Sequence, residues 1–160
     1  RKHTSDDYRK IIEKLRKVKP DLLLSGDFIV GFPGETDQDF LETLRLVKDV
    51  QYGQSYSFKY SSRPGTPAAS REEVSESLKK ERLAELQLLL SEQQMAIQNS
   101  MIGKEVKVLF EKPGRLNDQM GGKSEYLHAV HVIGRSIKKG DIKRVKIINT
   151  ETNSLGGVLV

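Results

Sequence analysis

The sequence predicts an α/β segment that is followed by a small all-β barrel. In the first hundred residues, stretches with apolar residues at helical spacing alternate with short strand-like runs, which is typical of a parallel sheet. After Gly103 the pattern changes to short strand-like runs separated by Pro and Gly turns, at 105–110, 127–133, 142–149 and 154–160. Several short strands that close on themselves form a small barrel without free edges.

The α/β segment begins with an amphipathic helix over 6–18. Thr4 or Ser5 can cap this helix, and Pro20 lies just past its end. The run Leu22–Gly31 is then almost continuously apolar and ends in a turn. Such a run is typical of a strand that is buried on both faces of a parallel sheet.

A second helix and a second strand follow. Thr36 can cap the helix, and the alternating segment Gln54–Tyr60 predicts a strand in which Tyr56, Phe58 and Tyr60 share one face. Two strands alone leave both edges of their sheet unpaired. We therefore expect further strands from a missing N-terminal part of the same protein.

The second half of the chain begins with a connector. The segment 61–70 is rich in Ser, Pro and Gly and predicts a loop, and a long helical pattern follows over 73–101. Gly121-Gly122 is interpreted as one of the turns between the later strands. We therefore divide the chain into an α/β segment over 1–70, a connecting helix over 71–101 and a barrel over 102–160.

Composition limits the function further. No run of about 18 uncharged apolar residues occurs, which excludes a membrane-spanning helix. The first residues lack the apolar region of a secretory signal, so we expect a cytoplasmic protein. The net charge of +5 lies in residues 102–160, which carry 11 Lys and Arg against six Asp and Glu. This asymmetry favours a polyanionic partner for the barrel.

Metal ligands are scarce. The chain has no cysteine, so it offers no thiolate to zinc or to an iron-sulfur cluster. His128 and His131 are three positions apart on the predicted strand and thus point to opposite faces. We expect no metal site within this chain.

A first motif runs from Asp27 to Thr36. It places a carboxylate within an apolar strand and a glycine-rich turn, Gly31-Phe32-Pro33-Gly34, at the end of that strand. Glycines allow backbone amides to approach a ligand closely. The alternative is a tight structural turn in which neighbouring amides satisfy a buried Asp27. The pattern alone favours neither, although the absence of a following Gly-Lys-Ser/Thr disfavours a phosphate-binding P-loop.

A second motif runs from Phe58 to Pro67. A strand ends in Phe58-Lys59-Tyr60, and the loop that follows presents Arg63 between Pro and Gly residues. Aromatic side chains at a strand end can stack an adenine, and a fixed guanidinium suits a carboxylate or a phosphate. The alternative is a surface turn with a solvated arginine.

Both motifs, together with Asn153-Ser154-Leu155, resemble the methylthiotransferases of the radical S-adenosylmethionine superfamily. Arg63-Pro64-Gly65-Thr66 and the segment 110–115 most resemble members that modify tRNA, and the similarity covers essentially the whole chain. The resemblance implies that residues 1–70 are the C-terminal part of a radical-SAM partial TIM-type barrel. It also implies that residues 102–160 form a TRAM domain, which is an OB-like RNA-binding barrel.

The resemblance implies a reaction and its cofactors. The full-length protein would add a methylthio group to C2 of N6-isopentenyladenosine next to the anticodon of tRNA. It would use S-adenosylmethionine and two [4Fe-4S] clusters, whose cysteine ligands this chain lacks. We expect the fragment alone to be inactive. The leading alternatives are a stand-alone RNA-binding module without catalysis and a methylthiotransferase that acts on another tRNA adenosine or on a ribosomal protein.

The resemblance also assigns candidate site residues, although it identifies no catalytic residue. The cofactor-binding candidates are the residues on the two strands: Asp27, Ile29, Gly31, Phe58, Lys59 and Tyr60. The substrate-binding candidates lie in loops: Arg1, Thr4 and Arg63.

The barrel is a candidate RNA-binding module on its charge alone. Phe110 and Tyr126 are its only aromatic residues, so contacts with phosphates should outweigh base stacking. We expect tRNA as the partner and a monomeric protein. The candidate RNA-binding residues are eight of its 11 basic side chains: Lys112, Arg115, Lys123, Arg135, Lys138, Lys139, Lys143 and Arg144.

Overall fold

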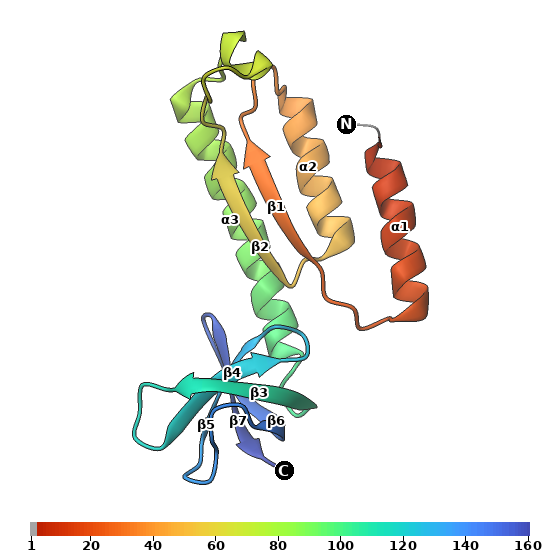
Figure 1. Cartoon of the computed structure of the whole chain (residues 1–160). Helices are drawn as coiled ribbons and strands as arrows, with labels where there is room; N and C mark the ends of the chain where they lie inside the picture. The colour runs from red at the N-terminus through yellow and green to blue at the C-terminus, as the bar shows by residue number, and fades with distance from the viewer. Residues whose placement is uncertain (1–2) are drawn as a thin grey trace. The chain divides into compact units, whose positions relative to one another are not determined.

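The computed structural model describes residues 3–160. The chain forms two compact units, residues 1–94 and 95–160, and each is described by itself. Figure 1 shows the elements in chain order from red to blue. None of the helices within residues 3–160 has the length and apolar character that crossing a membrane requires.

The first two helices of the chain begin where their caps predict. α1 (Ser5–Val18) and α2 (Asp37–Val50) each start after a threonine whose hydroxyl accepts a backbone N–H of the first turn. In both, the third residue of the helix returns a carboxylate to the backbone N–H of the cap, Asp7 to Thr4 and Asp39 to Thr36. This reciprocal pair satisfies donors that a helix start leaves free, and the carboxylates favour the positive end of the helix dipole.

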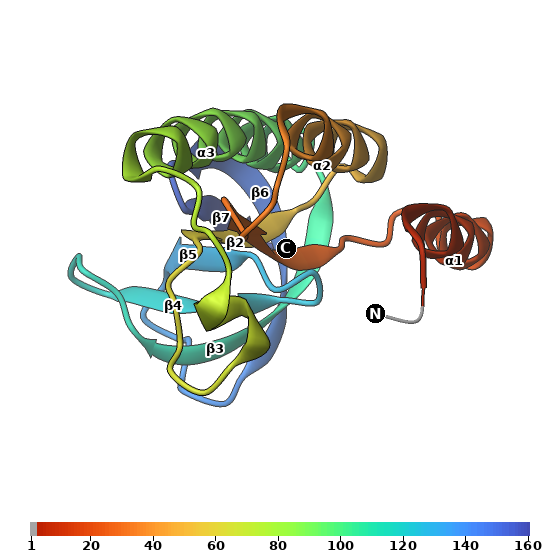
Figure 2. The same ribbon diagram turned by 90° about the horizontal axis from the view of Figure 1, so that it is seen from above.

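The sheet of the first unit has two parallel strands. β1 (Ser25–Val30) pairs with β2 (Gln54–Lys59), from Ser25 opposite Gln54 to Val30 opposite Lys59. This confirms the predicted helix and strand alternation. α2 and the long helix α3 (Glu76–Asn99) cover the same face of the sheet, as the view in Figure 2 shows.

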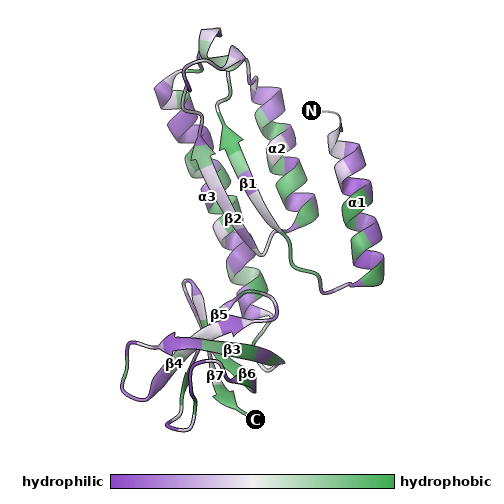
Figure 3. Cartoon of the chain, in the orientation of Figure 1, coloured by the Kyte–Doolittle hydropathy of each residue, from purple (hydrophilic) through white to green (hydrophobic). Residues whose placement is uncertain are grey.

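The core of the first unit lies between that face and the helices. Figure 3 shows hydrophobic residues, in green, along β1 and on parts of α2. The buried residues come from α1, β1, α2, α3 and the segment after α2: Ile12, Val30, Phe40, Leu44, Val47, Val50, Tyr52, Leu86 and Leu90. Because α3 contributes Leu86 and Leu90, the predicted connector is also a structural part of the α/β unit.

The prediction that the first strand is buried on both faces is wrong for the described residues. The strand begins at Ser25, and Ser25, Asp27 and Ile29 are all exposed on the face opposite the helices. A strand of a parallel sheet is buried twice only where other elements cover both faces. Residues 3–160 supply helices on one face, so Asp27 lies on an open surface instead of in a core.

The prediction that Tyr60 shares a face with Tyr56 and Phe58 is also wrong. β2 ends at Lys59, and Tyr60 is only 8% exposed while Tyr56 and Phe58 are 56% and 55% exposed. Beyond the strand the alternation of side chains no longer applies. The ring of Tyr60 instead packs edge-on against Phe32, with 5.1 Å between the ring centroids.

A short 3-10 helix, η1 (Pro67–Ser70), lies in the predicted loop before α3.

The second unit is a closed barrel with strand order β3-β4-β5-β7-β6, which confirms a small all-β barrel. Its strands are β3 (Glu105–Pro113), β4 (Gln119–Ser124), β5 (Ala129–Ile133), β6 (Ile142–Glu151) and β7 (Ser154–Leu159). All pairs are antiparallel except β5 with β7. The core consists of inward residues at alternating strand positions together with Met101 and Ile137, which lie outside the strands: Met101, Val106, Val108, Phe110, Val130, Val132, Ile137, Val145, Ile147 and Leu155.

The interpretation of Gly121-Gly122 as a turn is wrong, because both residues lie within β4. The register of β3 and β4 shifts between Phe110 and Lys112 at a bulge, which brings the two backbones close together. A Cβ atom on Gly122 would lie 2.1 Å from the carbonyl oxygen of Leu109. These glycines therefore serve a close backbone approach inside the sheet.

Gly122→Ala should destabilise the barrel by about 3 kcal/mol, the upper end of the cost of overpacking, because its methyl group meets rigid backbone. Gly121→Ala is the matched control, since its Cβ would have its nearest neighbour, the Lys112 carbonyl oxygen, at 3.8 Å. We expect the control to change the free energy of unfolding by less than about 1 kcal/mol. Urea unfolding of the 160-residue chain measures both. Equal effects would show that the close approach does not constrain β4.

Candidate functional site

The turn after β1 is closed by its own glutamate. Gly31 and Gly34 have φ angles of +69° and +88°, a region that favours glycine. The N–H of Gly31 donates to Glu35 Oε1 at 3.0 Å, and the N–H of Glu35 donates to the Phe32 carbonyl at 2.8 Å. Because the Gly31 amide already has a protein acceptor, this part of the motif forms a tight structural turn.

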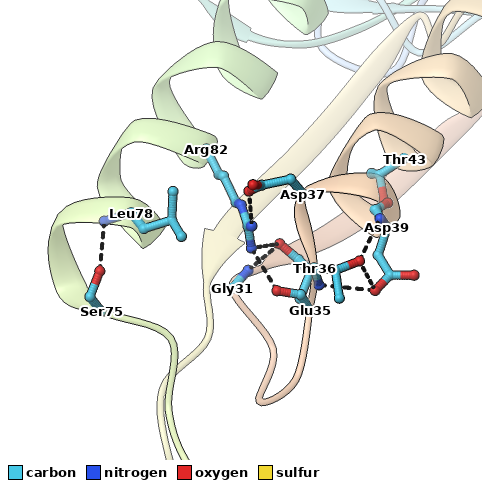
Figure 4. Close-up of polar contacts among 9 residues, drawn as sticks. All are labelled: Gly31, Glu35, Thr36, Asp37, Asp39, Thr43, Ser75, Leu78 and Arg82. Carbon is cyan, nitrogen blue, oxygen red and sulfur yellow. Dashed lines mark hydrogen bonds and ion pairs between the residues drawn. The ribbon is translucent and has the colours of Figure 1, made fainter.

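Arg82 of α3 fixes this turn from the helix side (Figure 4). Its side chain is 4% exposed, and Nη1 donates to the carbonyl of Glu35 at 3.1 Å and to Glu35 Oε1 at 2.9 Å. Nη2 donates to Asp37 Oδ1 at 2.7 Å, and the guanidinium lies 5.6 Å from the ring centroid of Phe40. One buried cation therefore joins the turn, the start of α2 and α3.

The sequence reasoning missed Arg82, which is 47 residues from Glu35. One signal could have found it. Arg82 precedes Leu86 and Leu90 by four and eight positions, so it lies on the same face of α3 as these two core leucines. A cation on the buried face of a helix needs an anionic partner, and the glutamate of the glycine-rich turn can supply that charge.

The open face of the sheet carries the other part of the site. We use the name open face for Asp27 and Ile29 of β1 and for Tyr56 and Phe58 of β2. Asp27 is opposite Tyr56 and Ile29 is opposite Phe58 in the strand register. Ile29, Tyr56 and Phe58 are 58%, 56% and 55% exposed. The residues described in the structure give the Asp27 carboxylate no hydrogen-bond or ion-pair partner. An unpaired carboxylate beside two free aromatic faces can bind a ligand with an aromatic ring and hydroxyl or cationic groups.

The structure separates the six cofactor-binding candidates into two groups. Asp27, Ile29 and Phe58 lie together on the open face. Lys59 instead pairs with Glu76 of α3, with 2.6 Å between Nζ and Oε2. Gly31 and Tyr60 are buried. The second group thus lies behind the open face or at the ends of its strands, and its role at a ligand stays a prediction.

The two substrate-binding candidates within residues 3–160 lie on different parts of the first unit. Thr4 is the cap of α1, where its hydroxyl accepts the N–H of Asp7 at 3.2 Å. Arg63 is exposed in the loop after β2, and its carbonyl accepts the N–H and the hydroxyl of Thr66 at 3.2 and 2.8 Å. Arg1 lies outside the described residues. The role of all three stays a prediction.

A second candidate surface lies at one end of the barrel. The N–H of Gly140 donates to the carbonyl of Phe110, and the N–H of Gly134 donates to the carbonyl of Asp118, both at 2.8 Å. These bonds hold the loops 114–118 and 134–141 beside the end of β3. We use the name basic end for the cations of this region: Lys112, Arg115, Arg135, Lys138, Lys139 and Lys143.

Nearby carboxylates only partly neutralise the basic end. Asp118 accepts Nε–H of Arg135 at 2.9 Å, and Asp141 accepts the backbone N–H of Lys138 at 3.1 Å. Lys143 Nζ is 3.8 Å from Asp141. These pairs are largely exposed and therefore weak. A positive excess remains that can attract an anionic polymer.

The last two RNA-binding candidates lie elsewhere on the barrel. Lys123 Nζ donates to the Leu127 carbonyl at 3.4 Å, and Arg144 Nη1 lies 3.8 Å from Glu105 Oε2. Lys107, which the candidate set leaves out, is opposite Arg144 in the register of β3 and β6. An alternation count along β3 could have found it, because Lys107 falls between the inward Val106 and Val108.

Metal chemistry has no support within the described residues. Among residues 3–160, no cluster of three or more His, Asp or Glu side chains could hold a metal ion. The sequence contains no cysteine. An iron-sulfur cluster therefore finds no ligand set in this chain.

Arg82→Met should lower the free energy of unfolding by about 3 to 5 kcal/mol, because it leaves Glu35 buried without its cation. Adding Glu35→Gln should recover part of the loss, since it removes the unpaired charge. Arg45→Met is the matched control: its side chain is 62% exposed and pairs with an exposed Glu42, so less than about 1 kcal/mol is expected. Urea unfolding measures all three. A loss in Arg82→Met no larger than in the control would contradict the anchoring role.

Comparisons with known proteins show what the chain is similar to. Residues 1–47 match the family model of the radical SAM superfamily. The chain is 60% identical over 161 aligned positions to the tRNA-2-methylthio-N(6)-dimethylallyladenosine synthase of Jannaschia sp. (strain CCS1). It is 57% identical to the protein of that name from Roseobacter denitrificans and 54% identical to that from Ruegeria sp. (strain TM1040).

These matches cover 99 to 100% of this chain but only 35 to 36% of each relative. The chain thus spans about a third of the length of the curated relatives it matches. Over that whole span it is similar to tRNA-2-methylthio-N(6)-dimethylallyladenosine synthases, which confirms the resemblance to radical-SAM methylthiotransferases that its motifs predict.

Proposed function

We propose that the chain is the C-terminal portion of a tRNA methylthiotransferase. The full-length protein adds a methylthio group to C2 of N6-isopentenyladenosine next to the anticodon. The observation that carries this proposal is the identity of 54 to 60% across the chain to relatives that are named for this activity. We expect it to act as a monomer in the cytoplasm, with tRNA as its partner.

In this proposal the two units have separate tasks. β1 and β2 are the last two strands of a radical-SAM partial TIM-type barrel, and residues 102–160 are an OB-like TRAM domain. The parallel register of β1 and β2 and their uncovered face support the first assignment. The closed five-stranded barrel and the basic end support the second.

The open face fits S-adenosylmethionine. Tyr56 and Phe58 offer aromatic faces to an adenine, and the Asp27 carboxylate can accept ribose hydroxyls or face a sulfonium. When bound, S-adenosylmethionine supplies the methyl group and the radical of the reaction. The residues of this chain bind and orient it: Asp27 fixes its polar side, and Ile29 and Phe58 exclude water from its apolar side.

The two [4Fe-4S] clusters do not fit this chain, because it has no thiolate. Their ligands must come from another part of the protein. This agrees with a chain that spans about a third of its relatives. The fragment should therefore bind RNA without performing the reaction.

RNA binding is assigned to the basic end. Six cations around two strand-connecting loops can contact successive phosphates, and the exposed ion pairs with Asp118 and Asp141 can exchange for phosphate at small cost. Arg63, in the loop after β2, is assigned to substrate binding. Arg1 and Thr4 are assigned to substrate binding as well.

Replacing Lys112, Lys138 and Lys139 by Gln should weaken tRNA binding. The slope of log affinity against log salt should flatten by about 0.7 to 0.9 for each phosphate contact that is lost. The matched control replaces Lys10, Lys14 and Lys17 of α1, which carry the same charge on an exposed helix. Fluorescence titration of the chain with tRNA at several salt concentrations measures the affinity and its salt dependence. An equal loss of tRNA affinity in both triple variants would show that the basic end is only a solvated surface.

Asp27→Asn tests the proposed reaction in the full-length protein loaded with its clusters. The change removes the charge from the open face, so affinity for S-adenosylmethionine should fall about 10-fold to 100-fold, as for a lost hydrogen bond to a charged group. Asp6→Asn on exposed α1 is the control. Because Asp27 is exposed, the melting temperature should not change.

Mass spectrometry of the treated tRNA identifies the product nucleoside. Wild-type protein that binds tRNA but consumes no S-adenosylmethionine would support a stand-alone RNA-binding module. A methylthio group on another tRNA adenosine or on a ribosomal protein would change the substrate but keep the chemistry. Normal affinity for S-adenosylmethionine and normal turnover in Asp27→Asn would show that the open face is not part of the site.

A further inference from the structure

The first turns of α3 contact the end of β2 through a chain of alternating charges. Lys79 is 1% exposed, and its Nζ donates to Glu73 Oε2 at 2.6 Å and to Glu76 Oε1 at 2.9 Å. The other oxygen of Glu76 accepts Nζ–H of Lys59, the last residue of β2, at 2.6 Å. α3 is thus joined to the end of β2 by an ordered set of four side chains.

The same lysine also occupies the space beside the end of β1. A Cβ atom on Gly31 would lie 2.4 Å from Cγ and 3.2 Å from Cδ of Lys79. Gly31 also has a φ of +69°, so both its backbone and its surroundings require a glycine. The glycine at the end of β1 therefore makes room for the Lys79 stem.

A third contact completes the arrangement. The ammonium of Lys79 lies 5.8 Å from the ring centroid of Tyr60, whose N–H donates to the Val30 carbonyl at 2.8 Å. Tyr60 follows β2, and Val30 ends β1. The contacts of Lys79 thus reach the residues that join the two strand ends to each other.

The hydrogen bonds of this network favour the charged forms of Glu76 and Lys79. Hydrogen bonds from Lys59 and Lys79 lower the pKa of Glu76 to about 2. Hydrogen bonds to Glu73 and Glu76 raise the pKa of Lys79 above its ordinary value. An apolar residue at position 79 could fill the space beside Gly31, but it could not hold the two glutamates.

We propose that Lys79 is a positioning residue, which fixes the ends of β1 and β2 relative to each other. It lies on the helix side of the sheet, so it does not touch a ligand on the open face. Its effect passes through Gly31 and Tyr60 to Ile29 and Phe58, which precede these strand ends. The consequence for S-adenosylmethionine rests on the proposed function, whereas the ordering of the strand ends does not.

The test uses Lys79→Met in the full-length protein, which keeps the stem beside Gly31 and removes the ammonium. Amide hydrogen exchange should rise about 10-fold or more in the segments 30–36 and 58–64 and stay unchanged in the barrel, since local opening is set by local contacts. The KM for S-adenosylmethionine should rise while tRNA affinity stays constant. Lys80→Met, at an exposed neighbouring position, is the matched control and should change neither quantity.

A second variant covers the case in which Lys79→Met fails to fold. Glu76→Gln changes a side chain that is 59% exposed, weakens the link to Lys59 and leaves the stem of Lys79 in place. Exchange should then rise in 58–64 more than in 30–36. Restoration of the wild-type exchange pattern and KM by Lys79→Arg would show that the cation carries the effect.

Three results separate the possible failures. Unchanged exchange in both segments, or a lower melting temperature with unchanged KM and kcat per folded molecule, would overturn the positioning role. Wild-type protein that makes no methylthio product would overturn the proposed function instead. The exchange pattern would still decide the role of Lys79 in that case, because it does not depend on turnover.

Discussion

The α/β unit depends on cations that α3 buries against the turn after β1. Arg82 joins Glu35 and Asp37, and Lys79 lies beside Gly31. Buried charges are costly unless each one is paired with good geometry, so these contacts admit few alternative arrangements. The turn, the start of α2 and the end of β2 consequently keep a defined relation to one helix. The positions of Asp27 and Phe58 on the open face depend on these contacts.

The two candidate surfaces use different physics. The open face has few groups, an unpaired carboxylate and two exposed aromatic rings, and it suits a small ligand that is held by specific contacts. The basic end has six cations, and the ion pairs formed there are exposed and weak. It suits a polyanion, for which the number of charges matters more than the place of each one. The proposed tRNA methylthiotransferase would use both kinds of surface.

The errors of sequence reasoning in this chain have a common cause. Alternation and capping correctly predicted α1, α2, β1 and β2, because those signals are local. The same reasoning interpreted Gly121-Gly122 as a turn, although the two glycines permit a close approach of β4 to the bulge in β3. It also placed Tyr60 with Tyr56, although the strand ends before Tyr60. In each case the deciding neighbour is distant in sequence or belongs to another element.

The sequence by itself determined the order of helices and strands, the α/β segment before the barrel, the location of the excess positive charge and the motifs that resemble methylthiotransferases. These properties follow from local spacing and composition, which need no partner to be read. Only the tertiary structure decided that Asp27 is exposed, that Lys59 turns to Glu76 and that Arg82 anchors the turn. Contacts between residues that are tens of positions apart in the sequence depend on how the elements pack. The role of a buried charge is therefore known only once its partner in the packed structure is known.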